Sequence, residues 1–286
     1  MKNKITIIFA LLGIMTASGS FAQDFTKGLS IKISAGYSVF TPGSDRQVIS
    51  PAELYNPQGG LVQLNSAGQN GEGFHFGLGA QKDFGEVLIA TLDISYTPQN
   101  KLTNNSFFNA DPFPSKSNGM ATGSMFTATP GVSFKVFRQA NYYIYTHLGL
   151  ILAFNEKYHS INTDTYPNFS PYQATYDDEY HYGVNTGLQG GLGVQFHLSG
   201  KISGFAELEN NFLNLSAKTL QGTIYETSSP NGTPTLVDTH FYKFSHSSSG
   251  TTSGNTTNNY TTGVFTPSIQ HFNSSVLTLG IAYAIR

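Results

Sequence analysis

The chain contains no cysteine and no tryptophan, and only 11% of its 286 residues are charged. Without cysteine it can form neither a disulfide nor a thiol-linked lipid anchor, so its stability must come from another source. A formal net charge of −2 gives no electrostatic basis for binding nucleic acid. We therefore expect neither a disulfide scaffold nor a nucleic-acid partner.

Long hydrophobic runs are also missing, except at the N-terminus. Residues Ile5 to Met15 form an apolar segment that follows two lysines, and Ser20-Phe21-Ala22 supplies small residues before Gln23. Such a segment is too short for a membrane-spanning helix, which needs roughly 20 apolar residues. The pattern is typical of a secretory signal peptide. We predict a signal peptide over 1–22 and a single β-barrel domain over 23–286.

The rest of the chain is dominated by alternation of apolar residues with polar or very small ones. Residues 184–198 are the clearest example: Leu188 and Leu192 alternate with Gln189 and glycines. Period-two alternation over this length predicts a long strand with one apolar and one polar face. Eight such stretches are predicted, at 29–40, 73–83, 87–97, 122–137, 142–154, 184–198, 202–213 and 272–285. Pro130 interrupts the fourth, and a proline there favours a sheet edge or a bulge.

The predicted strands are joined alternately by short turns and by long polar segments, and aromatic residues cluster at both strand ends. This asymmetry is typical of membrane barrels. We predict an all-β fold, a closed up-and-down antiparallel transmembrane β-barrel of eight strands with long extracellular loops. A soluble β-sandwich or ligand-binding barrel is the less favoured alternative, because its strands are usually about 5–6 residues long. Residues 220–227 and 235–244 could pair as a protruding hairpin or enlarge the barrel to ten strands.

Two segments carry a family resemblance. Residues 204–209 (GFAELE) and 275–283 (SVLTLGIAY) resemble the last strands of bacterial outer-membrane barrels of the OmpA-transmembrane-domain, OmpX and OmpW kind, also called the porin family, and the loop style resembles Bacteroidota members. The resemblance implies a monomer in a bacterial outer membrane, in contact with lipid and lipopolysaccharide. It also implies periplasmic chaperones and the barrel-assembly machinery as partners during biogenesis. The C-terminal Arg286 departs from the family, which often ends in an aromatic residue.

Five charged residues fall on the predicted lumen face: Lys32, Asp93, Lys135, Glu207 and Glu209. An eight-stranded barrel has an interior only wide enough for its own side chains. Buried charges need partners because desolvation is costly. We therefore predict a polar network that plugs the lumen, with Glu207 or Glu209 against Lys135 or Lys32. An ion path or gate is the alternative interpretation.

No catalytic, cofactor or metal site is predicted. His75, His147 and His197 also point inward but at different heights, whereas metal ligands must converge within about 2 Å of one ion. No G-x-S-x-G signature accompanies the serines and histidines. The acidic run Asp177-Asp178-Glu179 could bind a cation bridging lipopolysaccharide phosphates. We interpret it instead as a solvated loop face, since three consecutive acids do not face one ion.

The last predicted loop, roughly 216–271, offers four aromatic contact candidates: Tyr242, Phe244, Tyr260 and Phe265. Long loops on a rigid scaffold are where binding usually occurs. The sequence thus favours a non-enzymatic barrel with a structural or surface-interaction role through its loops. The alternatives are a narrow porin or route for small hydrophobic solutes, and a lipid-modifying barrel enzyme.

If the chain forms a closed barrel in lipid or detergent, its migration on a gel should change when the sample is boiled. The unboiled protein should keep its strand ladder and run as a compact band that differs from the boiled band. An identical position for the two samples would contradict the barrel.

Overall fold

The computed structural model describes residues 28–40, 62–67, 72–108, 115–166, 171–229, 231–244, 251–255, 260–265 and 269–285. The regular elements in these ranges are all β-strands. Across the same ranges, no helix has the length and hydrophobicity needed to cross a membrane. The predicted signal peptide, 1–22, lies outside the described residues and stays a prediction.

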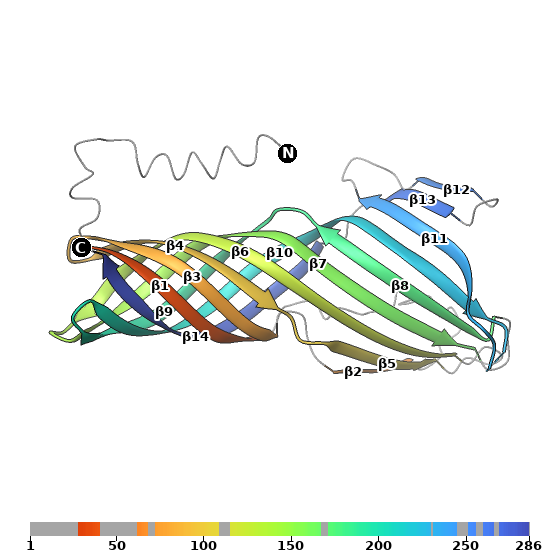
Figure 1. The fold of residues 1–286 in the computed structure, drawn as a ribbon, viewed down its shortest axis with the longest axis horizontal. Helices are drawn as coiled ribbons and strands as arrows, with labels where there is room; N and C mark the ends of the chain where they lie inside the picture. The colour runs from red at the N-terminus through yellow and green to blue at the C-terminus, as the bar shows by residue number, and fades with distance from the viewer. Residues whose placement is uncertain are drawn as a thin grey trace.

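Eight strands form a closed ring. They are β1 (Leu29–Phe40), β3 (Gly73–Phe84), β4 (Leu88–Pro98), β6 (Ser115–Arg138), β7 (Tyr142–Thr165), β9 (Asn185–Ser199), β10 (Ile202–Thr227) and β14 (Ile269–Ile285). Each pairs with the next in antiparallel fashion. β14 then pairs with β1, from Leu29 opposite Ile285 to Phe40 opposite Ser274. This closure confirms the predicted eight-stranded antiparallel barrel, drawn at the left of Figure 1.

Short turns close one end of the ring, which we call the turn end. Gly85 and Gly200 adopt φ values of 70° and 51° there, the left-handed region that glycine enters without steric cost. A side chain added at either glycine would meet open space, so backbone conformation alone selects glycine. The opposite end, where the long connections emerge, is called the loop end.

Three ring strands continue far beyond the loop end. β6 and β7 have 24 residues each and β10 has 26. A 24-residue strand reaches about 80 Å at roughly 3.3 Å per residue, whereas a bilayer crossing takes about 9–11 residues. The described parts of the long connections are therefore largely strands rather than loops. They contain β2 (Val62–Ala67), β5 (Leu102–Phe108), β8 (Gln173–Tyr182), β11 (Thr235–Phe244), β12 (Thr251–Asn255) and β13 (Tyr260–Phe265).

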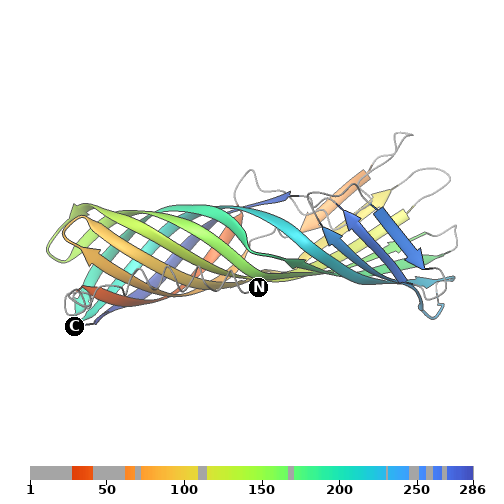
Figure 2. The same ribbon diagram turned by 90° about the horizontal axis from the view of Figure 1, so that it is seen from above.

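These strands extend the same sheet beyond the ring along β6, β7 and β10, and we call this part the extension sheet. Its order is β2-β5-β6-β7-β8-β10-β11-β13-β12, and only the β11–β13 contact is parallel. β4 and β5 pair with successive parts of β6, and β9 and β8 pair with successive parts of β7. Two predicted loops are thus continuations of ring hairpins. Figure 2 shows the extension sheet standing off one end of the ring.

The predicted pairing of 220–227 with 235–244 is confirmed as a hairpin of β10 and β11, from Thr219 opposite Lys243 to Glu226 opposite Thr235. This hairpin belongs to the extension sheet and does not enter the ring. The ten-stranded alternative is therefore wrong.

Two bulges, in β7 and in β10, interrupt the alternation of apolar and polar residues along the sequence. The β6–β7 register shifts between Ser124 and Phe126, where β7 carries an extra residue between Phe154 and Lys157. Such a bulge exchanges the two faces of a strand. Inward residues accordingly change from odd to even numbers, with Ala153 and Tyr158 both buried. β10 shifts similarly between Ala217 and Thr219.

Pro130 lies inside the ring, at neither an edge nor a bulge, so that prediction is wrong. It pairs with Leu92 of β4 in an uninterrupted ladder. On its other side, pairing with β7 lapses at 129–130 and resumes in the same register at Gly131. A closed ring has no edge strand on which a proline could be placed. Because proline has no backbone N–H, the pairing of β6 with β7 is interrupted locally.

Inward glycines make room for large lumen residues. The loss of stability on replacing a glycine by alanine should therefore depend strongly on the position of the glycine. A Cβ on the inward Gly193 would lie 2.4 Å from Cζ of Tyr145, whereas a Cβ on Gly190, which faces the outer belt, would lie 3.7 Å from Leu148. Gly193→Ala should destabilise the barrel by about 1–3 kcal/mol through overpacking, and Gly190→Ala should be close to neutral. The temperature at which the unboiled gel band is lost measures both, and equal midpoints would contradict this account of the lumen.

Candidate functional site in the lumen and the extension sheet

The ring is apolar outside and polar inside. Its exposed apolar belt includes Ile33, Leu188 and Leu148, with exposed fractions of 65%, 63% and 60%. Lys32, Ser133 and Thr278 are buried inside, as are many other hydroxyl and amide side chains. Water-soluble proteins rarely expose contiguous apolar patches beyond a few hundred Å². The belt surrounds the ring and requires an apolar environment.

Aromatic residues border this belt at both ends. At the loop end, Tyr37 packs edge-on against Phe74, and Tyr96, Phe126 and Phe154 follow one another with ring centroids 4.6 and 6.3 Å apart. At the turn end, Phe137 contacts Tyr142 at 6.0 Å between centroids. Aromatic rings favour the level of lipid headgroups.

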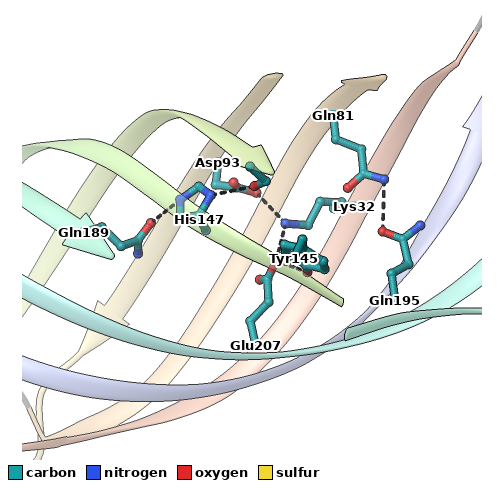
Figure 3. A network of polar contacts seen from close by, with 9 residues as sticks. Lys32, Gln81, Asp93, Tyr145, His147, Gln189, Gln195 and Glu207 are labelled. Carbon is teal, nitrogen blue, oxygen red and sulfur yellow. Dashed lines mark hydrogen bonds and ion pairs between the residues drawn. The ribbon is translucent and has the colours of Figure 1, made fainter. Parts of the chain in front are cut away.

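An ion network crosses the middle of the lumen. The Lys32 ammonium on β1 lies 3.1 Å from Glu207 Oε1 on β10 and 3.5 Å from Asp93 Oδ1 on β4. The Tyr145 hydroxyl donates a hydrogen bond to the same Glu207 oxygen. The ammonium also lies 4.7 Å from the ring centroid of Phe205. Figure 3 shows Lys32, Asp93, Tyr145 and Glu207 converging from four different strands.

Amide and imidazole groups extend this network. The two ring nitrogens of His147 contact Ser133 Oγ at 3.0 Å and Gln189 Oε1 at 2.9 Å. Gln81 on β3 donates to Gln195 on β9 across the lumen at 3.1 Å (Figure 3). Together with the ion pairs, these bonds tie opposite walls of the barrel to one another.

The remaining predicted lumen residues lie differently. Lys135 does not reach Glu207 or Glu209, and instead pairs with Asp83 at 2.8 Å near the turn end, 4.9 Å from the Tyr143 ring centroid. The alternation placed Lys135 inward but gave no information on height, because strand tilt offsets residues on neighbouring strands. Glu209 is buried one step above Glu207 on β10.

A small chamber lies between this network and the loop end. It offers about 40 Å³ to the centres of water molecules, and Asp93, Glu207 and Glu209 line it together with serine and threonine hydroxyls. One water needs about 10–15 Å³ by this measure, so the chamber holds about three.

Apolar side chains close the chamber toward the loop end. Met125, Ile151, Leu213 and Phe272 line the chamber and belong to one buried cluster. The same cluster continues upward through Tyr158 and Tyr182 into the extension sheet. The alternation gave no sign of this cluster, because most of these residues lie at the ends of predicted strands or in predicted loops. We call it the apolar plug.

The acidic run Asp177-Asp178-Glu179 lies on strand β8 and not in a loop, which corrects the prediction of a solvated loop face. Its outer-face members pair with bases, Asp177 with His159 at 2.6 Å and Glu179 with Lys157 at 3.6 Å. Asp178 faces the other way. The three acids therefore do not share a direction.

Asp178 instead contacts His240 of β11 at 2.8 Å, across the intervening strand β10. Gly222 separates them in the register, and a Cβ there would lie 2.1 Å from the Asp178 carboxylate. Tyr242, one of the predicted contact residues, stacks on His240 with ring centroids 5.1 Å apart.

Phe244 is half-buried at the end of β11. Tyr260 and Phe265 bound β13, and their side chains lie outside what the structure describes. The exposed Phe241 on the outer face was not among the predicted contacts.

Burial raises the pKa of Tyr180 on the inner face to about 12, so this tyrosine remains neutral at physiological pH.

The three inward histidines do not converge. His75 contacts Thr97 at 3.1 Å, His147 belongs to the lumen network, and His197 is exposed at the turn end. Within the described ranges, no three histidine, cysteine, aspartate or glutamate residues are grouped so as to hold a metal ion.

Comparisons with known proteins add little. No protein-family model matches the chain, and no curated protein matches it. Among solved structures, it is similar to the outer membrane protein OprG from Pseudomonas aeruginosa, with 12% identity, a TM-score of 0.37 and coverage of 89% of this chain and 94% of that one. A major outer membrane protein from Thermus thermophilus gives the same identity and TM-score, with coverage of 89% and 98%. Likeness at this level carries no argument about function.

Replacing Lys32, whose ammonium group lies between two carboxylates, tests the ion network. Lys32→Met should destabilise the barrel by about 3–5 kcal/mol, because Asp93 and Glu207 lose their buried partner. Lys157→Met removes an exposed ion pair and should cost no more than about 1 kcal/mol. Thermal loss of the unboiled gel band measures both. The double variant Lys32→Met/Glu207→Gln should recover part of the loss, and its failure to do so would contradict direct coupling.

Proposed function

We propose that the chain is an integral barrel of a bacterial outer membrane whose lumen is closed and whose extension sheet presents a surface for interactions outside the cell. The observation that supports this proposal is that the closed ring is apolar on its outside and polar on its inside. In lipid, every backbone polar group must be paired, which a closed ring achieves without edges. The signal-peptide pattern at the N-terminus and the turn–loop asymmetry support the outer membrane as the location.

Two successive barriers support a closed lumen. The Lys32 network ties opposite walls together by ion pairs and hydrogen bonds, and the apolar plug fills the lumen above it. An ion would have to break the first barrier and enter an apolar region at the second, where its desolvation is costly. This arrangement favours a structural or interaction role over a porin.

The extension sheet supports the interaction role. Its outer face carries exposed charged and aromatic side chains, among them Lys157, His159 and Phe241. A shallow groove on this face is lined by His159, Asp177, Glu179 and Phe241, among others. Lipopolysaccharide next to the belt is one expected contact, and the chain acts as a monomer. Periplasmic chaperones and the barrel-assembly machinery are its partners during biogenesis.

The absence of tryptophan allows a direct test of membrane placement. Tryptophan introduced at Leu208 or Leu148, both exposed on the belt, should be strongly quenched by lipids with brominated acyl chains. Tryptophan at Phe241 on the extension sheet should not be quenched. The wild-type chain supplies a background without tryptophan emission. Equal quenching at belt and extension positions would contradict the placement.

Planar-bilayer recording tests the closed lumen. The wild-type protein should show no large, stable conductance. A variant that opens both barriers, Glu207→Ala/Tyr145→Ala/Leu213→Ala/Phe272→Ala, should conduct if it folds, whereas Leu208→Ala on the belt should behave as wild type. Large and stable wild-type channels would overturn closure and favour the porin alternative.

The mass of lipid A tests the enzyme alternative. It should be unchanged when the protein is overexpressed, and a change would favour a lipid-modifying enzyme.

A further inference from the structure

The shallow groove on the outer face of the extension sheet reaches down to the aromatic border of the ring. Its upper hollow, lined by Asp177 and Phe241 among others, has a volume of about 410 Å³. A lower hollow of about 420 Å³ extends to Tyr96 on β4. His159 and Glu179 line both hollows, so the two form one groove, which we call the outer groove. Sites for small organic ligands have volumes of about 300–1,000 Å³.

The outer groove begins at the level of the lipid headgroups and rises above it. Tyr96 lines its lower end and belongs to the aromatic border at the loop end. Along β7, Lys157 and Ile161 lie three and seven residues beyond Phe154 of the same border, and Ile161 is paired with Asp177. At about 3.3 Å per residue and a strand tilt of about 40°, these positions stand roughly 8 and 18 Å above the border. The headgroup layer of one leaflet is only about 5–8 Å thick, so a membrane-anchored ligand must extend beyond it to fill the groove.

The charged side chains of the groove neutralise one another. Asp177 pairs with His159 at 2.6 Å. Glu179 lies 3.6 Å from the Lys157 ammonium and 3.3 Å from His181 Nε2. Two carboxylates thus face one lysine and two histidines, and the described residues of the groove carry no large excess of either charge. Their mutual pairing favours an uncharged, hydroxyl-rich ligand over a phosphate group, which would need an uncompensated cation.

Hydroxyl and amide groups and two aromatic rings complete the lining. Ser124 on β6 borders the lower hollow, and Gln221 and Thr223 on β10 border the upper one. Such groups both donate and accept hydrogen bonds, as sugar hydroxyls do. Tyr96 lines the lower hollow and the exposed Phe241 the upper one. Aromatic rings offer flat apolar surfaces with a large contact area, and the C–H face of a sugar ring can pack on them.

We propose that the outer groove binds the carbohydrate portion of lipopolysaccharide, the glycolipid next to the belt. The acyl chains lie against the apolar belt, and the sugars above them occupy the groove between Tyr96 and Phe241. The height of the upper hollow excludes a phospholipid headgroup, and the charge balance favours sugar hydroxyls over phosphate. This inference rests on the proposed function, because it requires the membrane placement and names the partner of the extension sheet.

A tryptophan at Phe241 reports on the groove, because the wild-type chain has no tryptophan. Full-length Phe241→Trp is refolded into three kinds of phospholipid vesicle: without lipopolysaccharide, with lipid A that lacks core sugars, and with lipopolysaccharide that carries them. We expect a saturable blue shift of the emission with core sugars only, since sugars over the ring exclude water from it. The temperature at which the unboiled wild-type gel band is lost should rise in the same vesicles alone, because a ligand of the folded state stabilises it.

Matched substitutions of exposed amides locate the effect. Gln221 lies in the upper hollow, whereas Asn118 is exposed on the outer face of β6, four residues beyond Thr122 and outside the lining of the groove. In the Phe241→Trp background, Gln221→Ala/Asp177→Ala should shift the response to at least severalfold higher lipopolysaccharide content. Asn118→Ala should leave it unchanged. The three replaced side chains are exposed, so none of these changes creates a cavity in the fold.

An equal response to lipid A without sugars would overturn the proposal and assign the groove to phosphate or acyl chains. No response in any of the vesicles would overturn it as well, and would favour a protein partner for the extension sheet. So would a response that Gln221→Ala/Asp177→Ala retains in full, because the sugars would then bind elsewhere. Quenching of the belt tryptophans by brominated lipid does not depend on these outcomes, so failure of the carbohydrate site is distinguishable from failure of the membrane placement.

Discussion

The pairing of β1 with β14 is the contact on which the rest of the structure depends. It joins the first and last ring strands through twelve residue pairs and removes both edges of the sheet. Without it, two rows of backbone donors and acceptors would face lipid, where each unpaired group is costly. Closure also defines an interior, so the polar face of every strand becomes a shared lumen. The belt and the ion network both follow from this one contact.

The interior of such a small ring must be filled by its own side chains, and this chain fills it in layers. A charged layer around Lys32 is followed by a water-sized chamber and then by the apolar plug. Inward glycines compensate for the bulk of large neighbours, as Gly193 does for Tyr145 and Gly280 for Phe205. The charged layer ties opposite walls together by ion pairs and hydrogen bonds, whereas the plug consists of apolar side chains. In the proposed function, the interaction surface therefore lies on the extension sheet.

The sequence could predict the ring because each membrane-facing strand records its two faces with period two. That rule identified the eight strands and the inward direction of Lys32, Asp93, Glu207 and Glu209. It failed beyond Phe154, where a bulge exchanges the two faces of β7, and a second bulge between Ala217 and Thr219 does the same in β10. The long connections were interpreted as loops because polar residues on both faces of a solvated sheet leave no periodic signal. Asp178 and His240 are an example, since only the register of β8, β10 and β11 brings them together.

By itself, the sequence determined where the eight ring strands lie and which face their residues take before the bulges, since local alternation encodes both. The choice of eight strands rather than ten for the ring came from the structure. Only the tertiary structure decided heights and partners: that Lys32 meets Asp93 and Glu207 while Lys135 pairs with Asp83. It also decided that Asp93, Glu207 and Glu209 line one chamber. Strand tilt and stagger set these contacts. Both are properties of the closed ring and appear in no single strand.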